Sequence, residues 1–193
     1  MPDELDRLNL PEPDPEWFRR PNGYDASASI HGLGHTRRVL VHAAELADAV
    51  GISPWEAEAL TLAALWHDIG RTNDGADYYH GAKSAGKAVA LGLHLGVEPM
   101  IYETSLYAIT HHCGNEQHGE RAASYLGFYE SDAQGEYRWT RIERDAALRV
   151  FRLLKDADGL DRVRLGDLDP SYLRYPESQA RLARAWQLLV RMP

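Results

Sequence analysis

A histidine and an aspartate stand side by side at the end of a very apolar run. The run covers residues 59–66, and His67 and Asp68 follow it directly. A neutral imidazole and a carboxylate are both good ligands for divalent first-row metals. Neighbouring residues on a helix point about 100° apart, so the pair can share an ion only if other helices close the site. A His-Asp pair alone more often forms a polar helix end, and the rest of the chain has to supply further ligands.

Further candidate ligands lie on predicted helices. They are His35, His80, His111, His112 and Asp158. His35 shares a helical face with Val39 and His42, but His42 lies two turns away, about 10 Å along the axis, too far to share an ion easily. The adjacent histidines end one predicted helix, just as the His-Asp pair ends another. Asp158 lies on the inward face of a later helix, near a C-terminus where a cation would offset the repulsion of acidic groups by the macrodipole.

The helices that must position these residues are visible as apolar periodicity with start and stop signals. We expect helices near residues 30–50, 53–69, 80–95, 99–112, 141–157 and 177–191. Ser53 to Glu56 has the form of a capping box with proline at the first helical position. Gly70 is placed for a C-cap of the same helix. The sequence therefore predicts an all-α fold, organised as a single compact helical bundle.

Two stretches lack a helical pattern. Residues 1–29 contain five prolines and predict an irregular N-terminal arm, so residues 30–193 form the helical core with its C-terminal helix. Residues 114–140 show no helical periodicity, although a small hairpin near 126–139 is compatible with their sequence. A loop of this length is often a functional lid or else disordered.

Composition restricts the partners. The net charge of −8 argues against a nucleic-acid polymer, and no apolar run is long enough for a membrane helix. The N-terminus is acidic and proline-rich, unlike a signal peptide. The lone cysteine, Cys113, excludes an intrachain disulfide and fits a reducing compartment. We therefore expect a cytoplasmic protein without membrane association.

The ordered set of ligands resembles the HD-domain superfamily of metal-dependent phosphohydrolases, whose signature is H…HD…H…H…D on a helical core. Four stretches carry the resemblance: residues 31–39 (HGLGHTRRV), 66–70 (WHDIG), 109–112 (ITHH) and 156–161 (DADGLD). Gly32 and Gly159 replace the aspartate and arginine that are usual in the first and last of these motifs. The third motif favours His112 over His111. The resemblance implies an HD-domain-like bundle over about residues 30–165.

The resemblance also implies the ligand roles. His35, His67, Asp68 and Asp158 would form one metal site, and His80 and His112 would add a second ion with Asp68 bridging. The expected cofactors are therefore divalent ions, two in number, drawn from Mn, Fe, Co, Ni and Mg. Two such ions about 3.5–4 Å apart can hold a hydroxide and the attacked phosphoryl group together.

The implied activity is a phosphohydrolase that attacks a nucleotide or another small phosphate ester with a metal-activated hydroxide. Asp68 would bridge and orient the nucleophile. Lys83, Arg38 and Arg71 are candidates for neutralising the phosphate, and His31 for donating to it or orienting a ligand. For these four residues a purely structural role is an equally good interpretation.

Two other functions are compatible with the same ligands. A minority of HD-domain proteins with six such ligands hold a mixed-valent di-iron centre and oxidise a substrate C–H bond. The other alternative is a non-catalytic sensor that binds a nucleotide. A polar, cation-rich pocket that works with Mn, Co or Ni would favour hydrolysis, whereas tightly bound iron and dioxygen uptake would favour oxygenation. The complete ligand set speaks against a sensor.

Overall fold

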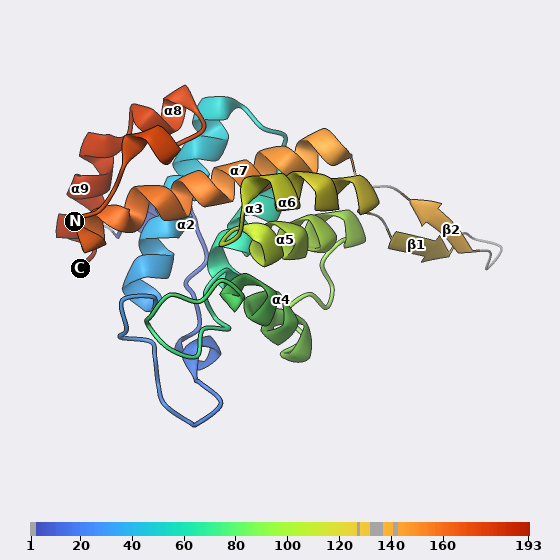
Figure 1. The fold of residues 1–193 in the computed structure, drawn as a ribbon, viewed down its shortest axis with the longest axis horizontal. Coiled ribbons are helices and arrows are strands. Elements are labelled where there is room, and N and C mark those ends of the chain that lie inside the picture. The colour runs from blue at the N-terminus through green and yellow to red at the C-terminus, as the bar shows by residue number, and fades with distance from the viewer. Residues whose placement is uncertain (1–2, 127, 132–136, 141–142) are drawn as a thin grey trace.

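The computed structural model describes residues 3–126, 128–131, 137–140 and 143–193. Its α-helices are α1 (Glu4–Leu8), α2 (Leu33–Val50), α3 (Pro54–Trp66), α4 (His80–Ala90), α5 (Pro99–His111), α6 (Glu116–Ala122), α7 (Arg144–Leu160), α8 (Pro176–Gln179) and α9 (Leu182–Arg191) (Figure 1). Short 3-10 turns occur at η1 (Pro15–Phe18), η2 (Ala123–Tyr125), η3 (Asp161–Leu165) and η4 (Pro170–Tyr172). The predicted all-α class is confirmed.

Helix α3 lies at the centre of the bundle, packed against α2, α5 and α7. It is apolar on nearly all sides, which suits a helix surrounded by others. The predicted capping box is present: the Ser53 amide and hydroxyl both donate to Glu56 Oε2, at 2.9 and 2.6 Å. Helix α7 runs along the helical bundle and also contacts α2 and α5, so four helices enclose one core.

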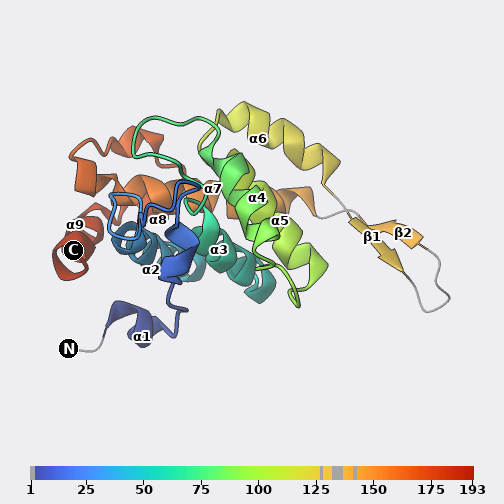
Figure 2. The ribbon, with the colours of Figure 1, turned by 90° about the horizontal axis from the view of Figure 1, so that it is seen from below.

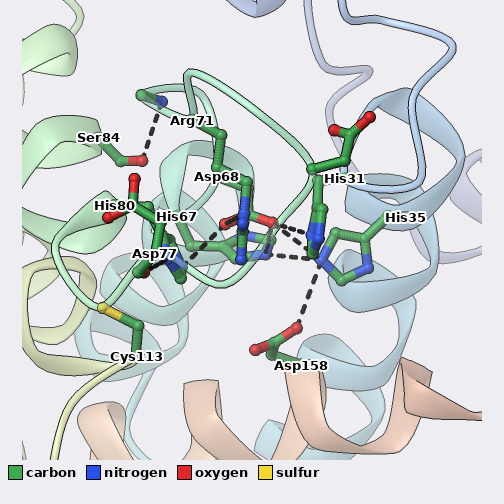
Figure 3. A network of polar contacts seen from close by, with 12 residues as sticks. His31, His35, His67, Asp68, Arg71, Asp77, His80, Ser84, Cys113 and Asp158 are labelled. Carbon is green, nitrogen blue, oxygen red and sulfur yellow. Dashed lines mark hydrogen bonds and ion pairs between the residues drawn. The ribbon is translucent and has the colours of Figure 1, made fainter. Parts of the chain in front are cut away.

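Helix ends, rather than helix middles, meet at one place in this bundle. The C-terminal ends of α3, α5 and α7 carry His67, His112 and Asp158. The N-terminal ends of α2 and α4 carry His35 and His80. All five side chains lie close to Asp68, as the close view of this region shows for the four that it labels (Figure 3).

Two glycines allow α4 to lie against its neighbours. A Cβ on Gly70 would lie 2.3 Å from the Ser84 backbone nitrogen, and one on Gly81 would lie 2.3 Å from the Ile109 carbonyl oxygen. No side chain fits at either distance. The predicted C-cap role of Gly70 is wrong, because α3 ends at Trp66 and His67 is its C-cap residue. Gly70 is instead a point of close backbone contact, and its amide donates to Ser84 Oγ at 2.9 Å.

The segment after α5 differs from the sequence-based expectation. Residues 116–122 form helix α6, capped by the Asn115 side chain, where we predicted no helix. The helix is only seven residues long, too short to show apolar periodicity. The compatible hairpin is present: β1 (Phe128–Ser131) pairs antiparallel with β2 (Tyr137–Thr140). Its turn, residues 132–136, lies outside the described residues.

Both ends of the chain lie on one side of the molecule, and the hairpin projects from the other (Figures 1 and 2). The predicted C-terminal helix is two helices, because the chain bends at residues 180–181 between α8 and α9. Helix α1 is joined to α9 through Glu4, which pairs with Arg184 at 3.0 Å and Arg191 at 3.1 Å. Among the described residues, no helix combines the length and the apolar character needed to cross a bilayer.

Candidate metal centre

One cluster of ligand atoms, here called the His35 group, consists of His35, His67 and Asp158. The two imidazole Nε2 atoms lie 3.0 Å apart, and His35 Nε2 lies 3.4 Å from Asp158 Oδ1. Both histidines are completely buried, whereas the Asp158 side chain is one-third exposed. The cluster is therefore enclosed by protein on the histidine side and reaches solvent beside Asp158.

A second cluster, the His80 group, consists of His80 and His112. Their Nε2 atoms lie 2.9 Å apart, and both residues are buried. The Cys113 sulfur belongs to the same set of ligand atoms, which lie within 4.8 Å of one another. That sulfur donates to the Tyr78 carbonyl oxygen at 3.3 Å, and burial raises the pKa of the thiol. Cys113 is therefore a neutral thiol adjacent to the His80 group, and we do not count it among the ligands of that group.

Asp68 lies between the two groups and turns one carboxylate oxygen to each. Its Oδ2 lies 3.5 Å from His35 Nε2 and 3.7 Å from His67 Nε2. Its Oδ1 lies 3.1 Å from His80 Nε2. Figure 3 shows Asp68 between His35 on one side and His80 on the other. This is the placement a carboxylate needs to bridge two ions.

The hydrogen bonds on the far side of each ring decide which nitrogen is free. The Nδ1 atoms of His67, His80 and His112 lie 2.8, 2.5 and 2.7 Å from the carbonyl oxygens of Ala64, Asp77 and Ile109. A carbonyl oxygen only accepts, so each Nδ1 carries a proton, and in the neutral form of each ring Nε2 presents a lone pair. In the His80 group two neutral rings would point these lone pairs at each other from 2.9 Å. They repel unless a cation lies between them, so the donor set fits a divalent ion.

Burial and neighbouring charges also favour the protonation states that metal ligands need, which are neutral imidazoles and an ionised carboxylate. Burial lowers the pKa of His67 to about 4 and that of His112 to about 3, so both rings are neutral near pH 7. Burial alone would raise the pKa of Asp68, but the nearby His67, His31 and His35 hold it well below its usual range. The carboxylate is therefore ionised and available to a metal.

His35 is the exception among the ligands. Burial opposes its protonation, but Asp158, Asp161 and Asp68 surround it and raise its pKa to about 10. The same carboxylates would attract a metal cation in place of that proton. Binding of a metal ion by this group would therefore be coupled to release of a proton from His35.

A family model described as HD domain matches residues 32–163 of the chain. The chain belongs to the HD domain family. Proteins of this family are generally metal-dependent hydrolases and typically bind divalent metals. The suspected resemblance is thereby confirmed, and the matched range contains every residue of the two ligand groups. No match was found among curated proteins or among solved structures.

An imidazole and a guanidinium of this HD domain contact the shared carboxylate from outside. His31 Nδ1 lies 2.9 Å from Asp68 Oδ2, and Arg71 Nε donates to Asp68 Oδ1 at 2.9 Å. Both side chains are mostly buried, at 12% and 11% exposed. Of the substrate-side candidates, these are the two that the structure brings to the bridging residue.

The structure does not bring the other candidates to the centre. Lys83 is nearly half exposed and donates to Asp77 Oδ2 at 2.7 Å. The His111 ring packs at 5.2 Å from the Tyr107 ring and belongs to neither ligand group of the described residues. Arg38 is buried behind His35, where its Nε donates to Asp161 Oδ1 at 2.6 Å. It is therefore not exposed to a phosphate.

Sequence reasoning gave no role to a carboxylate directly behind His35. Asp161 is completely buried, and its Oδ2 lies 2.7 Å from His35 Nδ1. The signal was present in the sequence, because Asp161 follows Asp158 by three residues and therefore lies near it on a helical surface. A carboxylate in this position fixes the tautomer of a metal-binding histidine and raises its basicity.

The glycine that replaces the usual aspartate of the first motif has a packing explanation. A Cβ on Gly32 would lie 2.1 Å from the Ser27 carbonyl oxygen. The preceding loop therefore crosses directly over this position, and its hydrogen bond from the Leu33 amide to Ser27 O is 2.7 Å. A Cβ on Gly159, in the last motif, would lie 3.4 Å from Leu173 Cδ2, an ordinary contact, so packing does not require glycine there.

Proposed function

We propose that the chain is a phosphohydrolase that uses two divalent ions to cleave a nucleotide or another small phosphate ester. The observation that carries this proposal is the position of Asp68, which faces both ligand groups and is also contacted by Arg71 and His31. A pair of sites joined by a carboxylate and flanked by the Arg71 guanidinium suits an anionic substrate. The same guanidinium is less suited to an uncharged C–H bond, so hydrolysis is preferred to oxygenation.

Divalent ions bound here would supply Lewis acidity toward a phosphoryl oxygen and a nucleophile at neutral pH. The chain itself supplies positioning and charge. Asp68 orients the centre through its two oxygens. Arg71 uses Nε on Asp68 and Nη1 on the Gly75 carbonyl oxygen, at 2.9 and 3.2 Å, which leaves guanidinium donors for a phosphate oxygen. Phosphoryl transfer needs mainly such positioning and charge neutralisation.

His31 has a different place beside the same carboxylate. Its Nδ1 lies between Asp68 Oδ2 at 2.9 Å and Arg164 Nη2 at 3.3 Å. The ring is thereby fixed in orientation, and burial lowers its pKa. A neutral, oriented imidazole is suited to donate a hydrogen bond to the substrate or to hold Asp68 in place. The net charge of −8 supports a small molecule rather than a nucleic-acid polymer as substrate.

Release of inorganic phosphate from a panel of nucleotides and sugar phosphates tests the proposal. Metal-stripped protein is supplied with Mn, Co, Ni or Mg, and compared with the Asp68→Ala variant. Asp74→Ala is the matched control, because Asp74 lies in the following loop and pairs with Arg20 at 2.5 Å rather than with a ligand. We expect metal-dependent release that Asp68→Ala lacks and Asp74→Ala retains.

The negative result is equally defined. If folded, metal-loaded protein releases no phosphate from any monoester or diphosphate, the proposal is wrong for those substrates, and phosphodiesters are tested next. Oxygen uptake by anaerobically iron-loaded protein would then identify the oxygenase alternative. Nucleotide binding that survives Asp68→Ala, without turnover, would identify the sensor.

A further inference from the structure

Behind His35, on the side away from the ligand atoms, a buried carboxylate is shared by two arginines. Asp161 accepts from Arg38 Nε at 2.6 Å and Arg38 Nη2 at 3.1 Å, a two-pronged contact. Its Oδ2 is also 3.3 Å from Arg164 Nη1 and 2.7 Å from His35 Nδ1. Asp161 is fully buried, and both arginine side chains are at most 7% exposed. The two arginines, Asp161 and His35 thus form a buried network of polar contacts, and His35 is the member of this network that belongs to a ligand group.

Each arginine is itself fixed by backbone carbonyls. Arg38 Nη1 donates to the Met192 carbonyl oxygen at 2.6 Å, and Arg164 Nε donates to the Ile30 carbonyl oxygen at 2.9 Å. The carboxylate therefore cannot turn without breaking its contacts to α2 and η3, and Arg38 is itself held by the segment after α9. A histidine whose outer nitrogen is bound to such a carboxylate has one ring orientation and one tautomer.

We propose that Asp161, held by Arg38 and Arg164, is a positioning residue that sets the metal affinity of the His35 group. The arginines neutralise part of the carboxylate charge, so the imidazole keeps its Nδ1 proton and its orientation instead of passing that proton to Asp161. The His80 group has no such carboxylate, because His80 and His112 bind backbone carbonyls through Nδ1. The inference rests on the proposed metal centre, but it does not depend on which reaction that centre performs.

This role differs from the phosphate contact predicted for Arg38 from the sequence. A phosphate-binding arginine would affect the KM for an anionic substrate and leave metal affinity unchanged. A positioning arginine would change metal affinity in the absence of any substrate. The two roles are therefore separated by a binding measurement alone.

The test is a titration of metal-stripped protein with Co²⁺, in which binding is monitored by calorimetry and by the visible spectrum of the bound ion. Two backgrounds isolate the sites: His80→Ala/His112→Ala retains only the His35 group, and His35→Ala/His67→Ala retains only the intact His80 group. Asp161→Asn is introduced into each. We expect its Co²⁺ affinity to fall about 10–100-fold in the first background, the usual effect of losing an outer partner of a ligand. In the second background we expect no change.

The matched control is Asp156→Asn. Asp156 is also completely buried on α7 and also pairs with an arginine, Arg174 Nη1 at 3.0 Å, but it contacts neither ligand group. Its substitution should lower the melting temperature and leave Co²⁺ affinity unchanged. If Asp161→Asn leaves the affinity of the His35 group within twofold, or if Asp156→Asn lowers it equally, the proposal is wrong.

Arg38 provides the second variant in case Asp161→Asn does not fold. Arg38→Lys retains a positive charge but loses the two-pronged contact. A several-fold loss of Co²⁺ affinity at the His35 group, larger in Arg38→Gln than in Arg38→Lys, supports the proposal. Unchanged affinity in Arg38→Gln, or an equal loss at the His80 group, overturns it. A failure of phosphate release with these binding results intact would contradict only the proposed reaction.

Discussion

At the scale of single residues, the centre depends on which ring nitrogen of each histidine is occupied. Three ligands bind a backbone carbonyl through Nδ1, and His35 binds the Asp161 carboxylate instead. All four therefore present Nε2 toward the ligand cluster. A carboxylate partner strengthens the histidine as a donor more than a carbonyl does. The two groups are consequently unequal, and the His35 group should bind its ion more tightly.

A fifth buried histidine has no such partner. His42 is completely buried in α2, and neither ring nitrogen has a hydrogen-bond partner among the described residues. Burial lowers its pKa to about 4 from 6.5. Below pH 6.5 the unfolded chain therefore takes up a proton that the folded chain refuses until about pH 4. The stability of the fold falls over this window, by at most about 3 kcal/mol from this residue.

We predict that His42→Leu removes this acid sensitivity. Leucine fills a similar space without placing two unpartnered polar atoms in the core. The variant should be more stable than the wild type, and its advantage should grow as the pH falls from 7 to 5. Melting temperatures of both proteins in the presence of a chelator measure this. An advantage that is constant with pH would show that His42 is not buried in the neutral form.

At the scale of elements, the site is made by the closeness of α4 to α5. Gly81 follows His80 directly and permits the backbone contact with Ile109 O that brings the His80 group together. Helix α4 also contains Gly86, where a Cβ would meet nothing within 4 Å. The same helix thus contains one glycine that is required by packing and one that is not.

We predict opposite effects of alanine at these two positions. Gly86→Ala should stabilise the protein by about 0.4–1 kcal/mol, because it reduces the entropy of the unfolded chain. Gly81→Ala should push α4 away from α5, destabilise the protein by about 1–3 kcal/mol and weaken metal binding by the His80 group. Thermal melting and metal stoichiometry measure both effects. Two tightly bound ions in Gly81→Ala would contradict the assigned role of this contact.

The arrangement of the helices also shows which parts of the site were predictable from the sequence. The resemblance to the HD-domain motifs implied that His35, His67, His80 and Asp158 are ligands, and the structure brings these residues together. His111 and His112 are separated by about 100° of helix rotation, and periodicity alone could not say which one points inward. The burial of Arg38 and its contact with Asp161 depend on side-chain directions between distant helices. Patterns of residues within one helix do not determine how its side chains are directed toward another helix.

At the scale of the whole molecule, the ends of the chain are joined by charges. Glu4 is mostly buried and pairs with Arg7, Arg184 and Arg191, while Glu45 on α2 pairs with Arg181 and Arg184. The network links α1, α2 and α9, and residues of these helices line a cavity of about 990 Å³. The arginines of the network are paired with carboxylates. These ion pairs of Glu4 and Glu45, here called the clamp, hold the two ends of the chain together.

We predict that Glu4→Gln weakens this clamp without affecting the metal centre. The bond to Arg184, opposed by partial burial and aided by Arg7 and Arg191, lowers the pKa of Glu4 to about 2. A carboxyl group whose pKa is lowered on folding stabilises the protein above its unfolded pKa near 4.5, and this stabilisation is lost as the pH falls toward 2. Glu4→Gln should therefore cost about 2 kcal/mol at pH 7 and about half of that near pH 3. Urea unfolding at both pH values measures the difference.

The stabilisation of the fold by bound metal provides a control for the Glu4→Gln prediction. An ion that binds only the folded chain stabilises it by about 2.7 kcal/mol at a concentration one hundred times its dissociation constant. Glu4 belongs to neither ligand group of the described residues, so the metal-dependent gain should be equal in the wild type and in Glu4→Gln. A smaller gain in Glu4→Gln would show instead that the clamp and the centre are coupled. The contact between Arg38 and the Met192 carbonyl oxygen, at the same end of the molecule, is the route by which such coupling would reach His35.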